Sequence, residues 1–216
     1  MEKNEFLSMV DHTILKADVK KEQIDEVINF AKNNKCASVC INPYYVKYAK
    51  EQLKNTNVKV CTVIGFPLGQ NTMDVKIYEA KDAEKNLADE IDMVINISEV
   101  KNKNYDYVYE EIKNIKNSTN LLLKVIIETA YLTDEEKKKV CEICKQIGVD
   151  FVKTSTGFAN SGATVDDVYL MKSIVGDTVK IKAAGGIKTK EDVINLYNAG
   201  ARRFGISKTS EILKSF

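Results

Sequence analysis

Residues 148–158 read GVDFVKTSTGF, and residues 179–187 read VKIKAAGGI. Each stretch holds a short apolar strand pattern that carries one lysine, Lys153 or Lys182, and is followed by glycine. Because a helical stretch separates them, the two predict a β/α unit whose parallel strands are covered by helices. This unit indicates the fold class of the whole chain.

The same alternation of apolar strand and amphipathic helix extends in both directions. We predict eight strands, within the stretches VDHTIL, ASVCIN, KVCTVIG, EIDMVIN, LLKVIIE, DFVKTS, VKIKAA and RRFGIS. Eight β/α units close into a TIM barrel, so the expected fold is an α/β (β/α)8 barrel formed by residues 1–216 as a single domain. A doubly wound open sheet is the alternative, but it normally carries a Gly-rich nucleotide turn after its first strand, and VDHTILKADV has none.

Local signals predict where particular helices begin and which faces they bury. Asn42 and Pro43 form a cap and first-turn pair, and residues 133–136 read as a capping box. Cys141 and Cys144 spell C-x-x-C inside a helical pattern, which favours core packing over a redox or metal role. The lysine run 137–139 is expected to lie on a solvated helix face.

Composition argues against several classes of function. Lys plus Arg number 32 and Asp plus Glu 31, so the net charge of +1 gives no global attraction to nucleic acid or anionic membranes. We see no signal peptide or membrane span, which predicts a cytoplasmic protein. Five cysteines without a secretory signal indicate reduced thiols. His12 is the single histidine, which argues against a zinc site or a Ser-His-Asp triad, so no metal is expected.

Three charged residues interrupt apolar strand patterns near strand ends, where barrel enzymes place their chemistry: Asp92, Lys153 and Lys182. A lysine attacks a carbonyl only as the free amine. If Lys153 and Lys182 face inward from neighbouring strands, the like charge of Lys182 and burial both favour the neutral amine of Lys153. The alternative is a structural lysine whose head forms a salt bridge with Asp92.

Glycines and hydroxyls near the end of the chain suggest an anion site. Eight of the ten glycines fall between Gly148 and Gly205, within the last three β/α units, where barrels commonly bind phosphate. Gly185, Gly186 and Gly205 lie in turns that can present backbone amides, although turn glycines without a ligand are the alternative. Asp11, Lys124 and Glu128 form a further polar set, in which two-residue alternation places Lys124 and Glu128 on the same strand face. We expect this set to orient Asp92 or the lysines.

The sequence resembles the deoxyribose-phosphate aldolase family, in its shorter prokaryotic form, along nearly its whole length. The motifs are DHTILK, VCTVIGFPLG with NTMDVKIYEA, ADEIDMVIN, LKVIIETAYL, GVDFVKTSTGF and IKAAGGIKT, in the family's order. The resemblance implies reversible cleavage of 2-deoxy-D-ribose 5-phosphate to D-glyceraldehyde 3-phosphate and acetaldehyde, in deoxyribose catabolism. It also implies no metal or organic cofactor, a small phosphosugar as the partner molecule, and a homodimer.

The resemblance also implies site residues. Lys153 looks like the imine-forming lysine, Lys182 like the lysine that perturbs it, and Asp92 like the proton donor and acceptor. The residues expected to bind the substrate and its phosphate are Thr156, Gly157, Gly185, Gly186, Gly205 and Ser207.

The chain departs from the family pattern at two places in the expected phosphate region. Phe158 is followed by Ala159, Asn160 and Ser161, where family members often have a Gly-rich run. After Gly205, where the family usually has small residues, this chain has Ile206, Ser207, Lys208 and Thr209. We expect these departures to change the affinity for phosphate. Lys208 either adds a cation to the phosphate site or points to solvent.

Two alternatives to this function remain open. Another imine-forming barrel, acting on a different phosphosugar or a keto acid, would share Lys153 and differ in its products. A non-catalytic phosphosugar-binding barrel would have no need of two lysines that face one another beside Asp92.

Overall fold

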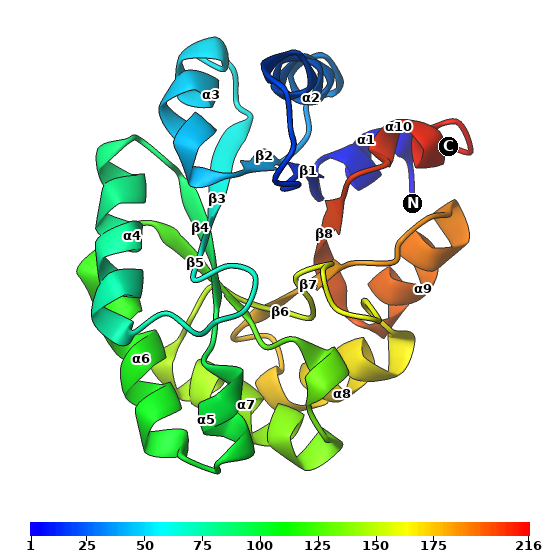
Figure 1. Cartoon of the computed structure of the whole chain (residues 1–216). Helices are drawn as coiled ribbons and strands as arrows, with labels where there is room; N and C mark the ends of the chain where they lie inside the picture. Colours follow the sequence, from blue (N-terminus) through cyan, green and yellow to red (C-terminus); the bar gives the residue numbers. More distant parts are fainter.

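Eight parallel strands pair in sequence order, and β8 returns to β1 to close a barrel (Figure 1). The computed structural model describes all residues, 1–216. The strands are β1 (Val10–Ile14), β2 (Ser38–Ile41), β3 (Lys59–Ile64), β4 (Glu90–Val94), β5 (Leu122–Ile126), β6 (Phe151–Lys153), β7 (Lys180–Ala184) and β8 (Ala201–Ile206). Each lies within one of the eight predicted stretches, so the predicted (β/α)8 fold is confirmed.

Helices surround the barrel and cover the outer face of every strand (Figure 1). They are α1 (Lys3–Leu7), α2 (Lys21–Asn34), α3 (Val46–Gln52), α4 (Met73–Lys85), α5 (Ile97–Lys101), α6 (Tyr105–Ser118), α7 (Asp134–Ile147), α8 (Val165–Val175), α9 (Lys190–Ala199) and α10 (Thr209–Leu213), with 3-10 turns at Pro43–Tyr45 and Thr129–Tyr131. None of these helices combines the length and the apolarity that crossing a membrane requires. The terminal helices α1 and α10 lie side by side, and the ring of Phe6 stacks on that of Phe216 with centroids 4.6 Å apart.

The main hydrophobic core lies between the strands and the helices. It contains 49 buried residues, among them Val39, Val60, Ile91 and Val125, which point outward from their strands. Adjacent residues of a strand point to opposite sides of the sheet, so the positions next to these outward residues face the barrel interior. The interior is therefore free to hold the polar side chains.

Helix starts agree only in part with the local signals. The capping box at Thr133 and Glu136 is confirmed, since each side chain bonds the other's backbone amide. Asn42 and Pro43 occupy the predicted cap and first-turn positions, but the element that they start is a 3-10 turn. The Asn42 side chain makes no capping bond, because its amide donates instead to the carbonyl of Lys16, 3.3 Å away.

The interior of helix α7 follows the predicted pattern with one exception. Cys141 and Cys144 are buried, as expected for core residues. Lys137, however, is not on a solvated face. Its ammonium lies between Asp134 and Asp167 on the neighbouring helix α8, and two carboxylates offset the cost of partial burial.

A fully buried ion pair joins α4 to α6 at the end of β4. The Lys76 ammonium lies 2.6 Å from Glu111 Oε1 and donates to the Val94 carbonyl, and Glu111 Oε2 accepts the Asn96 amide. Burial lowers the pKa of Lys76 and raises that of Glu111. The pair thus fixes the backbone that follows β4, at the cost of desolvating two charges.

We expect Lys76→Met to lower the free energy of unfolding by about 3–5 kcal/mol, because Glu111 is left buried without its cation. Urea denaturation measures this. The matched control is Lys138→Met, which removes the exposed i,i+3 pair with Glu135 and should cost under about 1 kcal/mol. Equal losses in the two variants would contradict the account.

Candidate active site

Charged side chains from six strands meet inside the barrel. They are Asp11 on β1, Glu90 and Asp92 on β4, Lys124 on β5, Lys153 on β6, Lys182 on β7 and Arg203 on β8. All but Arg203, which is partly buried, are buried. Isolated charges would be prohibitively expensive here, so the pairing of these groups decides whether the barrel interior is stable.

Asp92 is the centre of this network. Its Oδ2 accepts hydrogen bonds from Lys153 Nζ at 2.8 Å and Lys182 Nζ at 2.6 Å, and its Oδ1 from Lys124 Nζ at 2.9 Å. The Cys61 thiol also donates to Oδ1, 3.2 Å away. The two lysines that share Oδ2 stand opposite each other in the register of β6 and β7. Thus the predicted placement of Lys153 and Lys182 at matching depth on adjacent strands is confirmed.

Asp11 fixes Lys182 from the other side. Lys182 Nζ lies 2.5 Å from Asp11 Oδ2, while Asp11 Oδ1 accepts from Ser38 Oγ and Arg203 Nη1, each at 2.7 Å. Lys182 is therefore held between two carboxylates, those of Asp11 and Asp92. Burial would lower the pKa of Lys182, but the two carboxylates outweigh it and raise this pKa above the ordinary lysine value.

Lys124 performs the same bridging on the opposite side of the interior. Its ammonium lies 2.6 Å from Glu90 Oε2, 2.9 Å from Asp92 Oδ1 and 3.6 Å from Asp11 Oδ2. Burial would raise the pKa of Asp92, but the ammoniums of Lys124, Lys153 and Lys182 hold it well below its usual range. Asp92 is thus an anion that several cations share.

A cavity of about 320 Å³ opens at the carboxyl ends of β1, β6, β7 and β8. Among the interior lysines, Lys153 alone lines it. All of the residues predicted to bind substrate or phosphate line it too: Thr156, Gly157, Gly185, Gly186, Gly205 and Ser207. The structure therefore brings the predicted amine and the predicted anion-binding turns into one cavity.

Glu128 differs from its expected place beside Lys124. It has a left-handed backbone conformation, with φ of 50°, immediately after β5, so alternation along the strand no longer applies. Its carboxylate accepts the backbone amide and the hydroxyl of Thr156. Burial raises the pKa of Glu128, and the bonds from Thr156 partly oppose this. Glu128 thus holds the turn that carries Thr156 and Gly157 at the cavity wall.

Glycine is required where two cavity turns touch. A Cβ on Gly162 would lie 2.2 Å from the carbonyl oxygen of Gly185, and Gly185 itself has a left-handed φ of +82°. The Ala163 amide donates to the carbonyls of Ala184 and Gly185. Backbone alone therefore joins the turn after β6 to the turn after β7.

The two departures from the family pattern lie mostly outside the cavity. Asn160 and Ser161 are exposed and do not line it. Lys208 points to solvent, with its side chain 63% exposed and its ammonium 3.4 Å from Glu211. Of the residues at these two places, Phe158, Ile206 and Ser207 line the cavity.

His12 supports the same region from behind. It is buried on β1, with Nδ1 2.9 Å from the hydroxyl of Thr209 at the start of α10 and its ring 4.6 Å from that of Phe30. Burial lowers the pKa of His12 to about 4. His12 is thus a neutral imidazole that packs beneath the helix following Ser207.

The interior also places possible metal ligands together. Donor atoms of Cys40, Cys61 and Asp92 lie within 4.8 Å of one another. A cation there would face the ammoniums of Lys124, Lys153 and Lys182, all of which already contact Asp92. Repulsion between like charges makes this donor set a poor fit for a metal ion.

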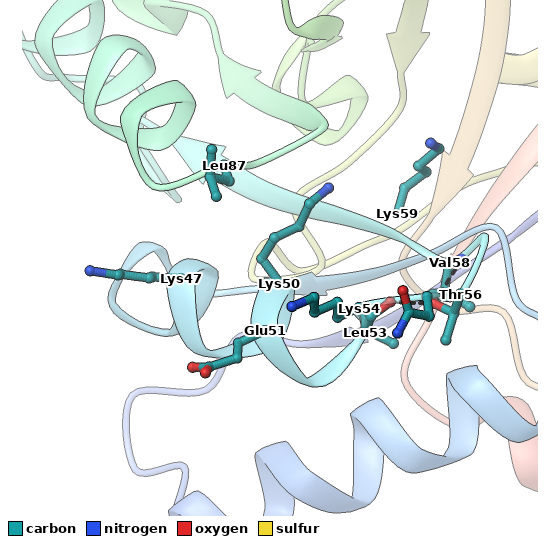
Figure 2. A pocket seen from close by; sticks show the side chains of 10 residues that line it. Lys47, Lys50, Glu51, Leu53, Lys54, Thr56, Val58, Lys59 and Leu87 are labelled. Atoms are coloured by element: carbon teal, nitrogen blue, oxygen red, sulfur yellow. Dashed lines mark hydrogen bonds between the residues drawn. The ribbon is translucent and has the colours of Figure 1, made fainter.

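A second, larger hollow of about 550 Å³ lies elsewhere, between α3, the start of β3 and Leu87 (Figure 2). Four lysines line it, but Lys50 is paired with both oxygens of Asp89, and Lys47 points away from the others. This hollow adjoins the amino-terminal end of β3. The active sites of barrel enzymes lie instead at the carboxyl ends of the strands. We therefore assign the chemistry to the smaller cavity.

Sequence reasoning missed several residues of this site. Thr13 and Lys16 line the cavity, and Glu90 and Arg203 complete the interior network. The signal was available for Glu90, which precedes Asp92 by two residues and so faces the same side of β4. Arg203 gave no clear signal, because it follows the exposed Arg202 at a strand start.

The fold and the site define a β/α-barrel protein with a lysine-lined cavity at the face where barrel enzymes act. The chain belongs to the family described as DeoC/LacD family aldolase, whose model matches residues 6–203. A relative from Staphylococcus carnosus named deoxyribose-phosphate aldolase is 53% identical over 97% of this chain and 96% of its own length.

Solved structures agree with this assignment. A putative deoxyribose-phosphate aldolase from Coccidioides immitis superposes with a TM-score of 0.97 at 37% identity, covering 100% of this chain and 87% of that one. A deoxyribose phosphate aldolase from Aeropyrum pernix, described as a unique tetramer, has a TM-score of 0.91 at 28% identity, with coverages of 100% and 92%.

The depressed pKa of His12 predicts a pH effect on stability. Because the folded pKa of about 4 lies below the unfolded value of 6.5, the neutral ring contributes stability above pH 6.5 that is lost as pH falls toward 4. The loss attributable to His12 is roughly 3 kcal/mol.

The single imidazole can be titrated by NMR without assignment work, and its midpoint should fall near pH 4. His12→Gln should weaken the pH dependence of urea unfolding between pH 6.5 and 4.5. A midpoint near 6.5 would show that the ring is not buried as described.

Proposed function

We propose that this chain is a Schiff-base aldolase that reversibly cleaves 2-deoxy-D-ribose 5-phosphate to D-glyceraldehyde 3-phosphate and acetaldehyde. The observation that carries the proposal is that Lys153 alone belongs both to the interior charge network and to the cavity. The proposal is further supported by the family assignment and by the name of the 53% identical relative.

The charge balance of the interior sets Lys153 apart from the other lysines. The network contains one more basic group than acidic group, counting Asp11, Glu90 and Asp92 against Lys124, Lys153, Lys182 and Arg203. Lys124 and Lys182 each bridge at least two carboxylates, whereas Lys153 contacts one oxygen that Lys182 shares. Of the three lysines, Lys153 therefore has the fewest carboxylate contacts.

The proposed reaction starts with attack of the Lys153 amine on the aldehyde carbon C1 of the open-chain sugar. Loss of water gives a protonated imine, which accepts electrons as the 3-hydroxyl loses its proton. Acetaldehyde retains C1 and C2, so the bond that breaks is C2–C3. The resulting enamine is protonated at C2, and water then releases acetaldehyde and the lysine.

Asp92 is the proposed group for moving these protons, directly or through water, since its Oδ2 is 2.8 Å from Lys153 Nζ. Lys182 supplies the like charge that favours the amine, and its second carboxylate, Asp11, keeps it in place. Lys124 holds the other oxygen of Asp92. We thus propose Asp11 and Lys124 as positioning residues.

The 5-phosphate is proposed to occupy the end of the cavity formed by Gly185, Gly186, Gly205 and Ser207. Left-handed φ angles of 82° and 76° at Gly185 and Gly186 let consecutive backbone amides face the cavity. Thr156 and Gly157 line the cavity nearer to Lys153 and are proposed to contact the sugar.

We further propose a cytoplasmic enzyme whose partner is a small phosphosugar, with no nucleic-acid partner, acting as a homodimer. Near-neutral net charge and the absence of a membrane-spanning helix support the first part. The homodimer rests on the family resemblance. A mass measurement in solution would distinguish it from a tetramer such as the one described for A. pernix.

Incubation with acetaldehyde or 2-deoxyribose 5-phosphate and borohydride should leave a reduced adduct on Lys153, because borohydride reduces the imine. Peptide mass mapping locates the adduct. It should be absent in Lys153→Ala and retained in Lys180→Ala, which removes an exposed lysine of β7. An adduct on Lys182, or none, would refute the assignment. Release of acetaldehyde distinguishes this reaction from those of other imine-forming aldolases.

Lys182→Met should lower kcat/KM near neutral pH by about 100-fold or more and move the acid limb of the pH–rate profile to higher pH. The reason is that Lys153 then holds its proton more tightly without a facing ammonium. Thermal unfolding should confirm that the variant is folded at each pH. A uniform loss of activity with an unchanged profile would contradict this role.

A further inference from the structure

The proposed phosphate end lacks a committed cation. The four residues proposed to form this end are all uncharged, yet a phosphomonoester carries about −1.5 to −2 charges at pH 7. Backbone amides alone can hold such a group, but a cation strengthens each contact because charge-assisted hydrogen bonds are roughly twice as strong as neutral ones. A free cation beside the cavity would supply such a contact.

The nearby cations are mostly committed elsewhere. Arg203 is bound to Asp11 and Glu90 inside the barrel. Lys208 faces solvent and Glu211, and neither it nor Lys188 lines the cavity. Lys153 is the amine proposed to attack the aldehyde carbon C1, so it is not counted as a phosphate ligand. These positions leave Lys16, which is the only other charged residue lining the cavity.

Lys16 lines the same cavity as the residues proposed to hold the phosphate. It follows β1, which pairs with β8 so that His12 lies opposite Ile206. The chain that leaves β1 therefore continues past Ser207, the residue after Ile206. The backbone of Lys16 is held at this level, because its carbonyl accepts the Asn42 side chain and the preceding Leu15 is buried.

The ammonium of Lys16 is free. No carboxylate lies within ion-pair distance of it, although most lysines that flank the barrel interior have such a partner. Its side chain is exposed at the mouth of the cavity, and a flexible four-carbon stem lets the ammonium move to meet an incoming anion. An ordinary loop lysine would be equally accessible to solvent, but Lys16 also lines the cavity.

We propose that Lys16 binds the 5-phosphate of the substrate and sets the preference for phosphorylated over free 2-deoxyribose. This rests on the proposed function. The cation thus comes from the turn after β1, whereas the amides come from the turns after β7 and β8. The missing Gly-rich run after Phe158 and the solvent-facing Lys208 leave this contact to Lys16.

The test compares Lys16→Met with Lys208→Met, a control that removes another exposed lysine, one that follows Ser207 and does not line the cavity. For Lys16→Met, we expect KM for 2-deoxyribose 5-phosphate to rise on the order of 10- to 100-fold with a smaller change in kcat. The ratio of kcat/KM for phosphorylated over free 2-deoxyribose should fall by the same factor. Lys16→Arg should restore most of it, and Lys208→Met should resemble the wild type.

Direct binding of inorganic phosphate to the wild type and both variants, measured by calorimetry, separates this proposal from the proposed function. Weaker phosphate binding in Lys16→Met supports the assignment even if another sugar phosphate is the substrate. The assignment is overturned if Lys16→Met binds phosphate as the wild type does, or if it slows phosphorylated and free substrate equally. Absence of deoxyribose 5-phosphate cleavage by the wild type refutes the proposed function alone.

Discussion

The carboxylate of Asp92 accepts three lysine ammoniums and a thiol in a site that water does not reach. Each of those lysines comes from a different strand, so the closed barrel and the charge network require one another. Without Asp92, the Nζ atoms of three buried lysines would face each other without the carboxylate that they share. Without the lysines, desolvation would make Asp92 take up a proton.

The lysines of the network differ in burial and in the number of carboxylates that they contact. Lys124 and Lys182 are fully buried and each bridges several carboxylates, so both remain charged. Lys153 has one shared partner and borders the cavity. The same carboxylate that stabilises the interior is thereby within hydrogen-bonding distance of the amine proposed to react. The contact between Asp92 and Lys153 therefore serves both the stability of the interior and the proposed reaction. Substitutions of these residues must be tested for folding as well as for activity.

The periphery of the site depends on backbone more than on side chains. Gly162 and Gly185 touch without room for a Cβ, and Glu128 fixes the turn of Thr156. Outside the barrel, Lys76 and Glu111 anchor the segment after β4. These contacts hold the loops while leaving the cavity mouth, with Lys16 and Phe158, accessible.

Alternation of apolar and polar residues determined, from the sequence alone, the eight strands and the inward direction of Asp92, Lys153 and Lys182, because side-chain direction in a strand repeats every two residues. The equal depth of Lys153 and Lys182 is set by the register of β6 and β7, which pairs the two residues. Only the tertiary structure decided that Asp92 is shared by four strands, that Glu128 turns away from Lys124, and that Lys137 is buried. Those outcomes depend on barrel closure, on one left-handed residue and on a neighbouring helix, which bring together groups far apart in the chain.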